Sequence, residues 1–110
     1  MNIQKLMYGV SEDKFFGDNF DIELDDTFDN EFTISSRLDI ELMLGCGVVI
    51  TVKLHSFDQV YVKFGNDYGD HMNLVYATEV FDMEKFVNWL IRSLMDFAYQ
   101  SRKVNKNLHE

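Results

Sequence analysis

Residues 82–103 read DMEKFVNWLIRSLMDFAYQSRK, and this stretch decides how the rest of the chain can be arranged. Its apolar residues recur at three- and four-residue spacing, which places them on one face of an α-helix. They are Met83, Phe86, Val87, Leu90, Leu94, Phe97 and Ala98. Asp82 is expected to cap the helix by accepting a hydrogen bond from the Lys85 amide. Phe81 is expected to pack on Phe86 as a hydrophobic staple. So broad an apolar face requires a sheet beneath it.

The chain before this helix supplies the sheet. Apolar and polar residues alternate in several runs, which is typical of antiparallel strands with one buried face. The expected strands are 20–25, 33–44, 48–54, 59–64 and 72–80, the last of ambiguous phase. Their connections are the turn Gly45-Cys46-Gly47, a turn at 55–58 and a loop at 65–70. The sequence therefore predicts an α+β fold: an antiparallel meander of four to five strands with one long helix packed on one face. A short helix near the N-terminus, around residues 2–8, is also compatible with this fold.

Length and composition indicate a single domain over residues 1–110. The chain has 110 residues, 46% of them hydrophobic and 15% aromatic, enough to build a core. The expected parts are an N-terminal segment (1–11), an acidic segment (12–31), the sheet (32–81), the helix (82–103) and a frayed polar tail (104–110). Neither a membrane span nor a signal peptide is expected, because no apolar run is long enough. The single cysteine, Cys46, cannot form an internal disulfide, which fits a cytoplasmic location.

Charge is the most informative property for function. Nineteen acidic residues against ten basic ones give a net charge of −9. Such a chain is repelled by nucleic acid and by anionic membranes and is attracted to basic protein surfaces. Residues 12–31 carry nine acidic residues and one basic residue, Lys14, so their net charge is 1 − 9 = −8. We therefore expect a basic protein as the partner, and no direct contact with nucleic acid or a membrane.

The strand predicted at residues 20–25 places part of this negative charge on one face. Phe20, Ile22 and Leu24 are expected to point inward, so that the carboxylates of Asp21, Glu23 and Asp25 line the other face. Carboxylates two residues apart on a strand lie about 6.5–7 Å from each other, close to the spacing of successive phosphates on one DNA strand. This face is either a solvated surface or an imitation of a phosphate backbone. The candidate partner-binding residues are Asp21, Glu23, Asp25, Asp26, Asp29, Glu31, Asp67, Asp70 and Trp89.

Trp89 is a candidate for a different reason. At about 100° per residue it falls outside the apolar arc of the helix, on the side of Lys85, Arg92 and Asp96. It either covers a sheet edge or the N-terminal segment, or it anchors an interface, since Trp is a frequent hot-spot residue. The outer face of the sheet offers a second candidate surface, formed by Arg37, Thr51 and Tyr61.

No motif predicts catalysis, a cofactor or a metal site. His55, His71 and His109 lie apart and show no metal-binding spacing. Asp67, Asp70 and His71 share one loop that could hold a cation, but the loop lacks the length and the acid register of an EF-hand. Cys46 has no basic sequence neighbour that would activate its thiol. We therefore expect a non-enzymatic protein.

In length, charge and compactness the whole chain resembles small acidic inhibitors encoded by phages, including anti-CRISPR proteins and DNA mimics. Bacterial immunity proteins that neutralise a toxin nuclease have the same profile. The resemblance implies an inhibitor that binds a basic nucleic-acid-handling protein, such as a nuclease or a CRISPR effector, in the cytoplasm (the host cytoplasm for a phage protein). The alternatives are an immunity protein and a structural or assembly protein. The last would self-associate, for example as a homodimer, through Trp89 and the open sheet edges.

Overall fold

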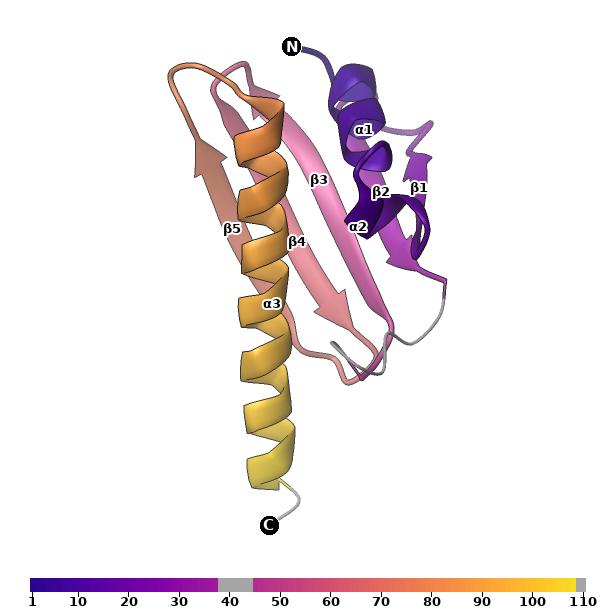
Figure 1. Ribbon diagram of the computed structural model, residues 1–110, viewed down its shortest axis with the longest axis vertical. Coiled ribbons are helices and arrows are strands. Elements are labelled where there is room, and N and C mark those ends of the chain that lie inside the picture. The colour runs from indigo at the N-terminus through magenta and orange to yellow at the C-terminus, as the bar shows by residue number, and fades with distance from the viewer. Residues whose placement is uncertain (38–44, 109–110) are drawn as a thin grey trace.

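The computed structural model describes residues 1–37 and 45–108, with side chains described as far as Ser101. One antiparallel sheet has the strand order β1-β2-β3-β4-β5, so each strand pairs with the next one in sequence (Figure 1). The strands are β1 (Phe20–Leu24), β2 (Glu31–Ser36), β3 (Val48–Ser56), β4 (Gln59–Asn66) and β5 (His71–Ala77). This is the predicted α+β meander, here with five strands.

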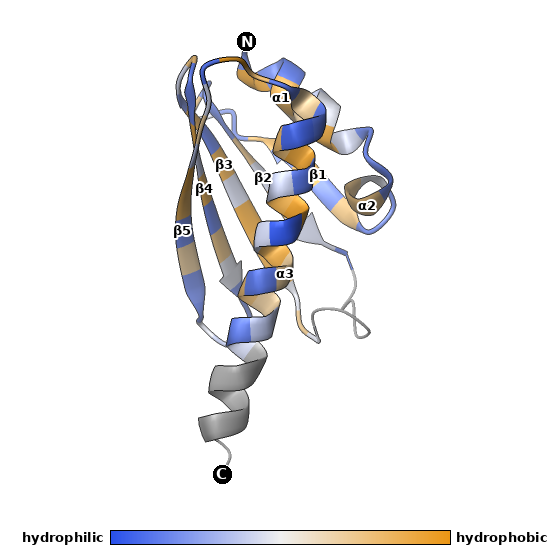
Figure 2. Cartoon of the chain, turned by 60° about the vertical axis from the view of Figure 1, so that its left-hand side comes forward, coloured by the Kyte–Doolittle hydropathy of each residue, from blue (hydrophilic) through white to orange (hydrophobic). Residues whose placement is uncertain are grey.

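The described helices all lie on one face of this sheet, as Figures 1 and 2 show from two sides. They are α1 (Ile3–Ser11), α2 (Lys14–Gly17) and α3 (Met83–Leu108). In Figure 1, α3 runs along β4 and β5, whereas α1 and α2 lie over the side of β1 and β2. Asn2 caps α1, because its Oδ1 accepts the Lys5 N–H at 2.8 Å, and Asp13 caps α2 through the Phe15 N–H. The opposite face of the sheet carries none of the described helices, and we call it the open face.

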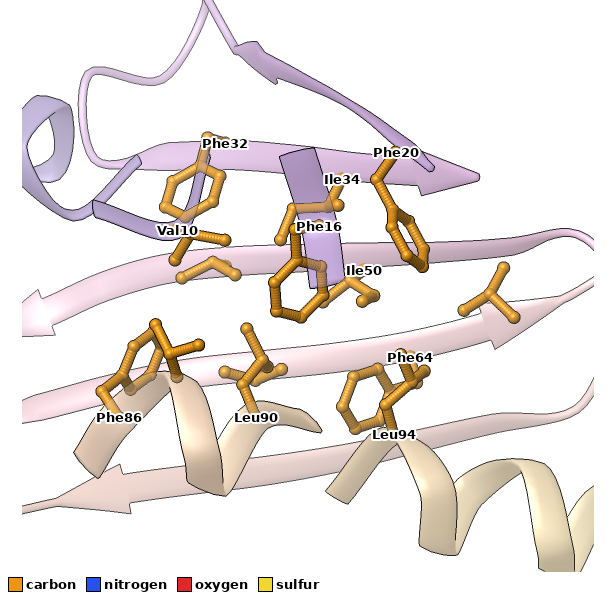
Figure 3. Close-up of a cluster of buried hydrophobic side chains, with 14 of the residues drawn as sticks. Val10, Phe16, Phe20, Phe32, Ile34, Ile50, Phe64, Phe86, Leu90 and Leu94 are labelled. Atoms are coloured by element: carbon orange, nitrogen blue, oxygen red, sulfur yellow. The ribbon is translucent and has the colours of Figure 1, made fainter. Parts of the chain in front are cut away.

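The core lies between the helices and the sheet. Alternate residues of the central strands point into it, and the helices supply the other half (Figure 3). Phe64 of β4 stacks on Phe97 of α3 with ring centroids 5.6 Å apart. The largest fully buried side chains are Phe16, Phe32, Phe64, Phe86, Leu6, Ile34, Ile50, Leu90, Leu94, Val10, Val52 and Val60. The N-terminal helix therefore contributes to the core through Leu6 and Val10.

The long helix begins as its sequence predicts. Asp82 Oδ1 accepts the Lys85 N–H at 3.1 Å, and the Phe81 and Phe86 rings lie 5.7 Å apart, which confirms both the cap and the staple. The predicted apolar face is buried apart from Met83, which is partly buried. The prediction was wrong about the end of the helix, which reaches Leu108 instead of residue 103. Helical backbone thus replaces most of the frayed tail expected at residues 104–110.

Several strand boundaries also differ from the prediction. β3 runs to Ser56, so the turn predicted at 55–58 contains only Phe57 and Asp58. β4 extends to Asn66, and β5 ends at Ala77 instead of Val80. Asp58 stabilises this short turn, because its Oδ1 accepts the Ser56 hydroxyl at 2.7 Å and its carbonyl accepts the Thr78 N–H at 3.1 Å.

Only the first part of the strand predicted at 33–44, residues 33–36, lies in β2. β2 starts two residues earlier, at Glu31, and Arg37 already lies beyond its end. The remainder of that prediction, residues 38–44, lies outside the described residues. Gly45 follows with a φ of 71°, a left-handed conformation that suits glycine and fits the predicted turn before β3.

A membrane-spanning helix is not found among the described residues, since none combines sufficient length with sufficient apolar character.

Candidate partner-binding surface

The open face is organised in rows of residues that lie opposite one another on successive strands. One row contains Glu23, Thr33, Thr51, Lys63 and Asn73, in order from β1 to β5. It runs from a carboxylate at the β1 edge, through neutral residues, to a lysine on β4. Opposite charges therefore lie at different positions across the sheet, and the negative side is that of β1.

Carboxylates concentrate on the hairpin formed by β1, the loop at 25–30 and β2, which we call the acidic hairpin (residues 20–36). It contains six acidic residues and no basic one. They are Asp21, Glu23, Asp25, Asp26, Asp29 and Glu31. The alternation predicted for β1 is confirmed at Phe20, which is buried, while Ile22 and Leu24 are partly buried against the core.

Two of the predicted binding carboxylates have partners within the chain. Asp21 forms an ion pair with Arg37, whose Nε lies 2.5 Å from Asp21 Oδ1. Asp25 Oδ1 accepts the Thr27 N–H at 2.8 Å and so stabilises the start of the loop. The line of three carboxylates at Asp21, Glu23 and Asp25 is therefore interrupted at both ends. This interruption weakens the hypothesis of an imitated phosphate backbone, which stays a prediction.

The tip of the acidic hairpin is more exposed. Asp26 and Asp29 are exposed, and Phe28 between them has 51% of its surface accessible. Two backbone hydrogen bonds hold the Phe28 backbone, from its N–H to Asp25 and from the Glu31 N–H to its carbonyl, each 3.2 Å long. An apolar ring between two carboxylates is thus presented by a loop with an ordered backbone. Glu31 follows in β2, partly buried and opposite Lys53.

Two neighbouring connections have the same character. Phe57, in the β3–β4 turn, is 76% exposed and is followed by Asp58. Val80, between β5 and α3, is 81% exposed and is preceded by Glu79. The Leu54 N–H donates to Asn30 O at 2.8 Å, and Thr78 N–H donates to Asp58 O, so the three connections are joined side by side. We call this edge of the sheet the loop end.

Asp67 and Asp70 lie at the opposite end of the sheet, in the β4–β5 turn. The structure therefore does not bring them together with the acidic hairpin, since the strands between the two ends are five to nine residues long. Asp67 Oδ2 accepts the Gly47 N–H at 3.0 Å, which ties this turn to the one before β3. The strand order of the predicted meander implies this separation, because its first and fourth connections lie at opposite ends of the sheet.

Asp70 belongs to a polar network that the sequence did not predict. The Ser101 hydroxyl of α3 donates to Asp70 Oδ2 at 2.5 Å and accepts from Asn66 Nδ2 at 2.6 Å. Asn66 Oδ1 also accepts the Asp70 and Tyr68 N–H groups, each at 3.0 Å. We call these three residues, Asn66, Asp70 and Ser101, the latch, because they bind the β4–β5 turn to α3. A cavity of about 280 Å³ lies beside them, lined by Met72 and Phe97 among others.

Trp89 lies on the sheet edge instead of projecting freely. It is half-buried, with its ring centroid 5.0 Å from Tyr76 of β5 and 6.0 Å from Phe86. Tyr76 also meets Phe81 and Phe86, so an aromatic cluster covers the inner side of β5. This position favours the alternative in which Trp89 covers an edge, and its role as an interface anchor stays a prediction.

The second predicted surface is divided by the structure. Thr51 and Tyr61 lie on the open face and line a shallow groove of about 320 Å³ with Lys53, Lys63 and Val75. Tyr61 stacks on His55 with ring centroids 4.5 Å apart. Arg37 is separate from them, at the far end of β2, where it pairs with Asp21.

The described residues contain no cluster of three metal-ligating side chains. Asp67, Asp70 and His71 do not converge on one point, because the two carboxylates accept hydrogen bonds from different segments. Cys46 is buried in the turn before β3.

No protein-family model matches this chain, and no curated protein or solved structure does either.

Proposed function

We propose that this protein is a non-enzymatic inhibitor that binds a basic, nucleic-acid-handling protein through its acidic hairpin and loop end. A nuclease or a CRISPR effector has the required surface chemistry. Such an inhibitor would act in the cytoplasm, in the host cell if a phage encodes it. An immunity protein that neutralises a toxin nuclease would use the same surface.

One observation carries the proposal: the tip of the acidic hairpin presents Phe28 between the exposed carboxylates of Asp26 and Asp29. Exposed carboxylates steer a basic partner and raise the association rate, and each of them contributes a modest share of the affinity. Affinity comes from apolar side chains that are desolvated at the centre of an interface. The tip combines both elements, and the neighbouring Phe57 and Val80 extend the apolar part.

Fewer carboxylates are available to a partner than the acidic segment 12–31 contains. Glu23, Asp26 and Asp29 are exposed and have no partner among the described residues. Asp21 already pairs with Arg37, and Asp25 already accepts the Thr27 N–H. Both carboxylates therefore have interactions within the chain that compete with binding to a partner. The three exposed carboxylates are therefore the ones that a partner's Lys and Arg side chains would meet.

The test is a competition experiment with the basic partner and its own DNA or RNA. The variant Glu23→Gln, Asp26→Asn, Asp29→Asn removes three charges and keeps the shape of the hairpin. Affinity should fall by about tenfold or more, which corresponds to about 1.4 kcal/mol, and the loss should shrink as salt rises. Phe28→Ser should weaken binding by a similar factor at every salt concentration, because its contribution is apolar.

A matched control changes the same number of charges on the helical layer. Glu12→Gln, Glu84→Gln, Asp96→Asn neutralises three exposed carboxylates outside the acidic hairpin. Equal loss of affinity in both triple variants would show that net charge alone attracts the partner, and would refute a defined binding surface. Simultaneous binding of the protein and nucleic acid to the partner would refute competition for the nucleic-acid site.

A further inference from the structure

The β5 strand is an edge of the sheet with free hydrogen-bonding groups. Among the described residues it pairs with β4 alone. Two backbone hydrogen bonds lie just beyond the two ends of the β4–β5 ladder: Asn66 N–H donates to Asp70 O, and Thr78 N–H donates to Asp58 O. They identify Asn66–Asp70 and Asp58–Thr78 as hydrogen-bonded pairs. By the alternation of an antiparallel ladder, Met72, Leu74 and Tyr76 bond to β4. The N–H and C=O groups of the odd-numbered residues of β5 consequently point away from the sheet.

This edge lacks the features that usually prevent strand pairing. Such features are a Lys, an acidic residue, a proline or a bulge on the edge strand. β5 reads HMNLVYA, with no acidic residue, lysine, arginine or proline, and its register with β4 runs without a shift. The other edge differs, because β1 carries Asp21 and Glu23. The chain therefore protects one edge with charge and leaves the other neutral.

The core is also incomplete beneath β5. The inward residues of β4, namely Val60, Val62 and Phe64, are at most 2% exposed. The inward residues of β5, by contrast, are only partly buried, as is Trp89 beside them. They are Met72, Leu74 and Tyr76. A strip of half-exposed apolar side chains thus runs along the same edge as the free backbone groups.

We propose that a second copy of this chain pairs with this edge through its own β5, which joins the two sheets about a two-fold axis. The outward groups of the odd-numbered residues meet when His71 lies opposite Ala77 and Asn73 opposite Val75 of the second copy. Leu74 then lies on the axis, facing Leu74 of the second copy. Four pairs that each exchange two bonds give about eight hydrogen bonds across the junction.

The neutral composition of β5 makes this edge the place where two copies of the acidic chain can approach each other. Two chains of net charge −9 repel each other wherever their carboxylates approach. At β5 the paired residues are neutral, apart from a histidine that faces an alanine. The arrangement is isologous and closed, so it stops at a dimer. On the face of the sheet that carries the helices, Met72 of one copy lies opposite Tyr76 of the other. This contact further buries Tyr76 and the neighbouring Trp89.

The experiment is sedimentation velocity over a range of protein concentration. We expect the wild-type mass to rise from 13.0 kDa toward twice that value as concentration increases. Higher salt should favour the dimer, because it screens the repulsion between the two acidic chains. Trp89 emission should shift to shorter wavelength with the same concentration dependence. A wild-type protein that stays monomeric up to about millimolar concentration, where only very weak association remains undetected, overturns the proposal.

The matched pair of variants is Val75→Pro and Val75→Thr. Proline removes an N–H that points to solvent on an edge strand, where it is tolerated, and so it should abolish the dimer and preserve the fold. Threonine keeps the N–H and the branched shape and should dimerise like the wild type. Val75→Lys adds charge to the edge without affecting the backbone and should also give a monomer. A dimer that persists in both Val75→Pro and Val75→Lys would place the junction elsewhere.

Discussion

Removing the Ser101 hydroxyl should destabilise the protein much more than its size suggests. The hydroxyl donates to Asp70 at 2.5 Å and accepts from Asn66 at 2.6 Å, and Ser101 is 7% exposed. A hydrogen bond to a charged group contributes about 1.5–3 kcal/mol, and the bond from Asn66 adds about 0.5–1.5 kcal/mol. Alanine recovers about 0.5 kcal/mol through its higher helix propensity, and Asp70 keeps its contact with Asn66 at 3.3 Å. Ser101→Ala should therefore cost about 1.5–4 kcal/mol.

The free energy of unfolding can be measured by urea denaturation followed by circular dichroism. At about 4 °C for each kcal/mol, the Tm of Ser101→Ala should fall by about 6–16 °C. Ser93→Ala is the matched control, because Ser93 lies on the same helix and has no hydrogen-bond partner for its hydroxyl among the described residues. A Ser101→Ala variant that equals the control within about 0.5 kcal/mol would refute the latch. The Asp70→Asn double-mutant cycle then measures the coupling between the two side chains.

Two further predictions concern α3. Leu90→Ala and Leu94→Ala remove fully buried side chains and should each cost about 2–5 kcal/mol in urea denaturation, and wild-type stability in both would contradict the position of the helix on the sheet. Trp89→Ala should cost about 2–4 kcal/mol, somewhat less than a fully buried aromatic, because the ring is half-buried against Tyr76. Unchanged stability together with weaker partner binding would instead make Trp89 an exposed anchor.

The sequence predicts the fold well where local patterning is strong. Strict alternation in β1, β3 and β4 and the spacing of the apolar residues in α3 are local signals, and they place these elements correctly. The boundaries fail where polar residues continue a strand, as Ser56 does, or where a strand is apolar on both faces. β5 is the second case, because Leu74 points inward and Val75 lies on the open face, so alternation does not show the phase.

The candidate surface is less visible in the sequence, because contacts between distant residues decide it. Asp70 is a loop carboxylate in the sequence, yet its partner Ser101 lies 31 residues away on α3. Asp21 binds Arg37 from 16 residues away. Trp89 falls outside the apolar arc of an isolated helix, but β5 and Tyr76 extend far enough to contact it. Helical geometry alone cannot show how far a sheet extends beneath a helix.

The strand order of the sheet has a consequence for the rate of folding. Every strand pairs with its neighbour in sequence, so each hairpin closes a local loop, the longest of them residues 37–47, and loses little chain entropy. Such local topology folds quickly for a protein that contains a sheet. The main exception is the contact between the two ends of the chain, where Met83 of α3 occupies the space beside Gly9 of α1. We therefore expect the meander to form before its N-terminal helix docks, so that the docking of α1 on α3 completes the core.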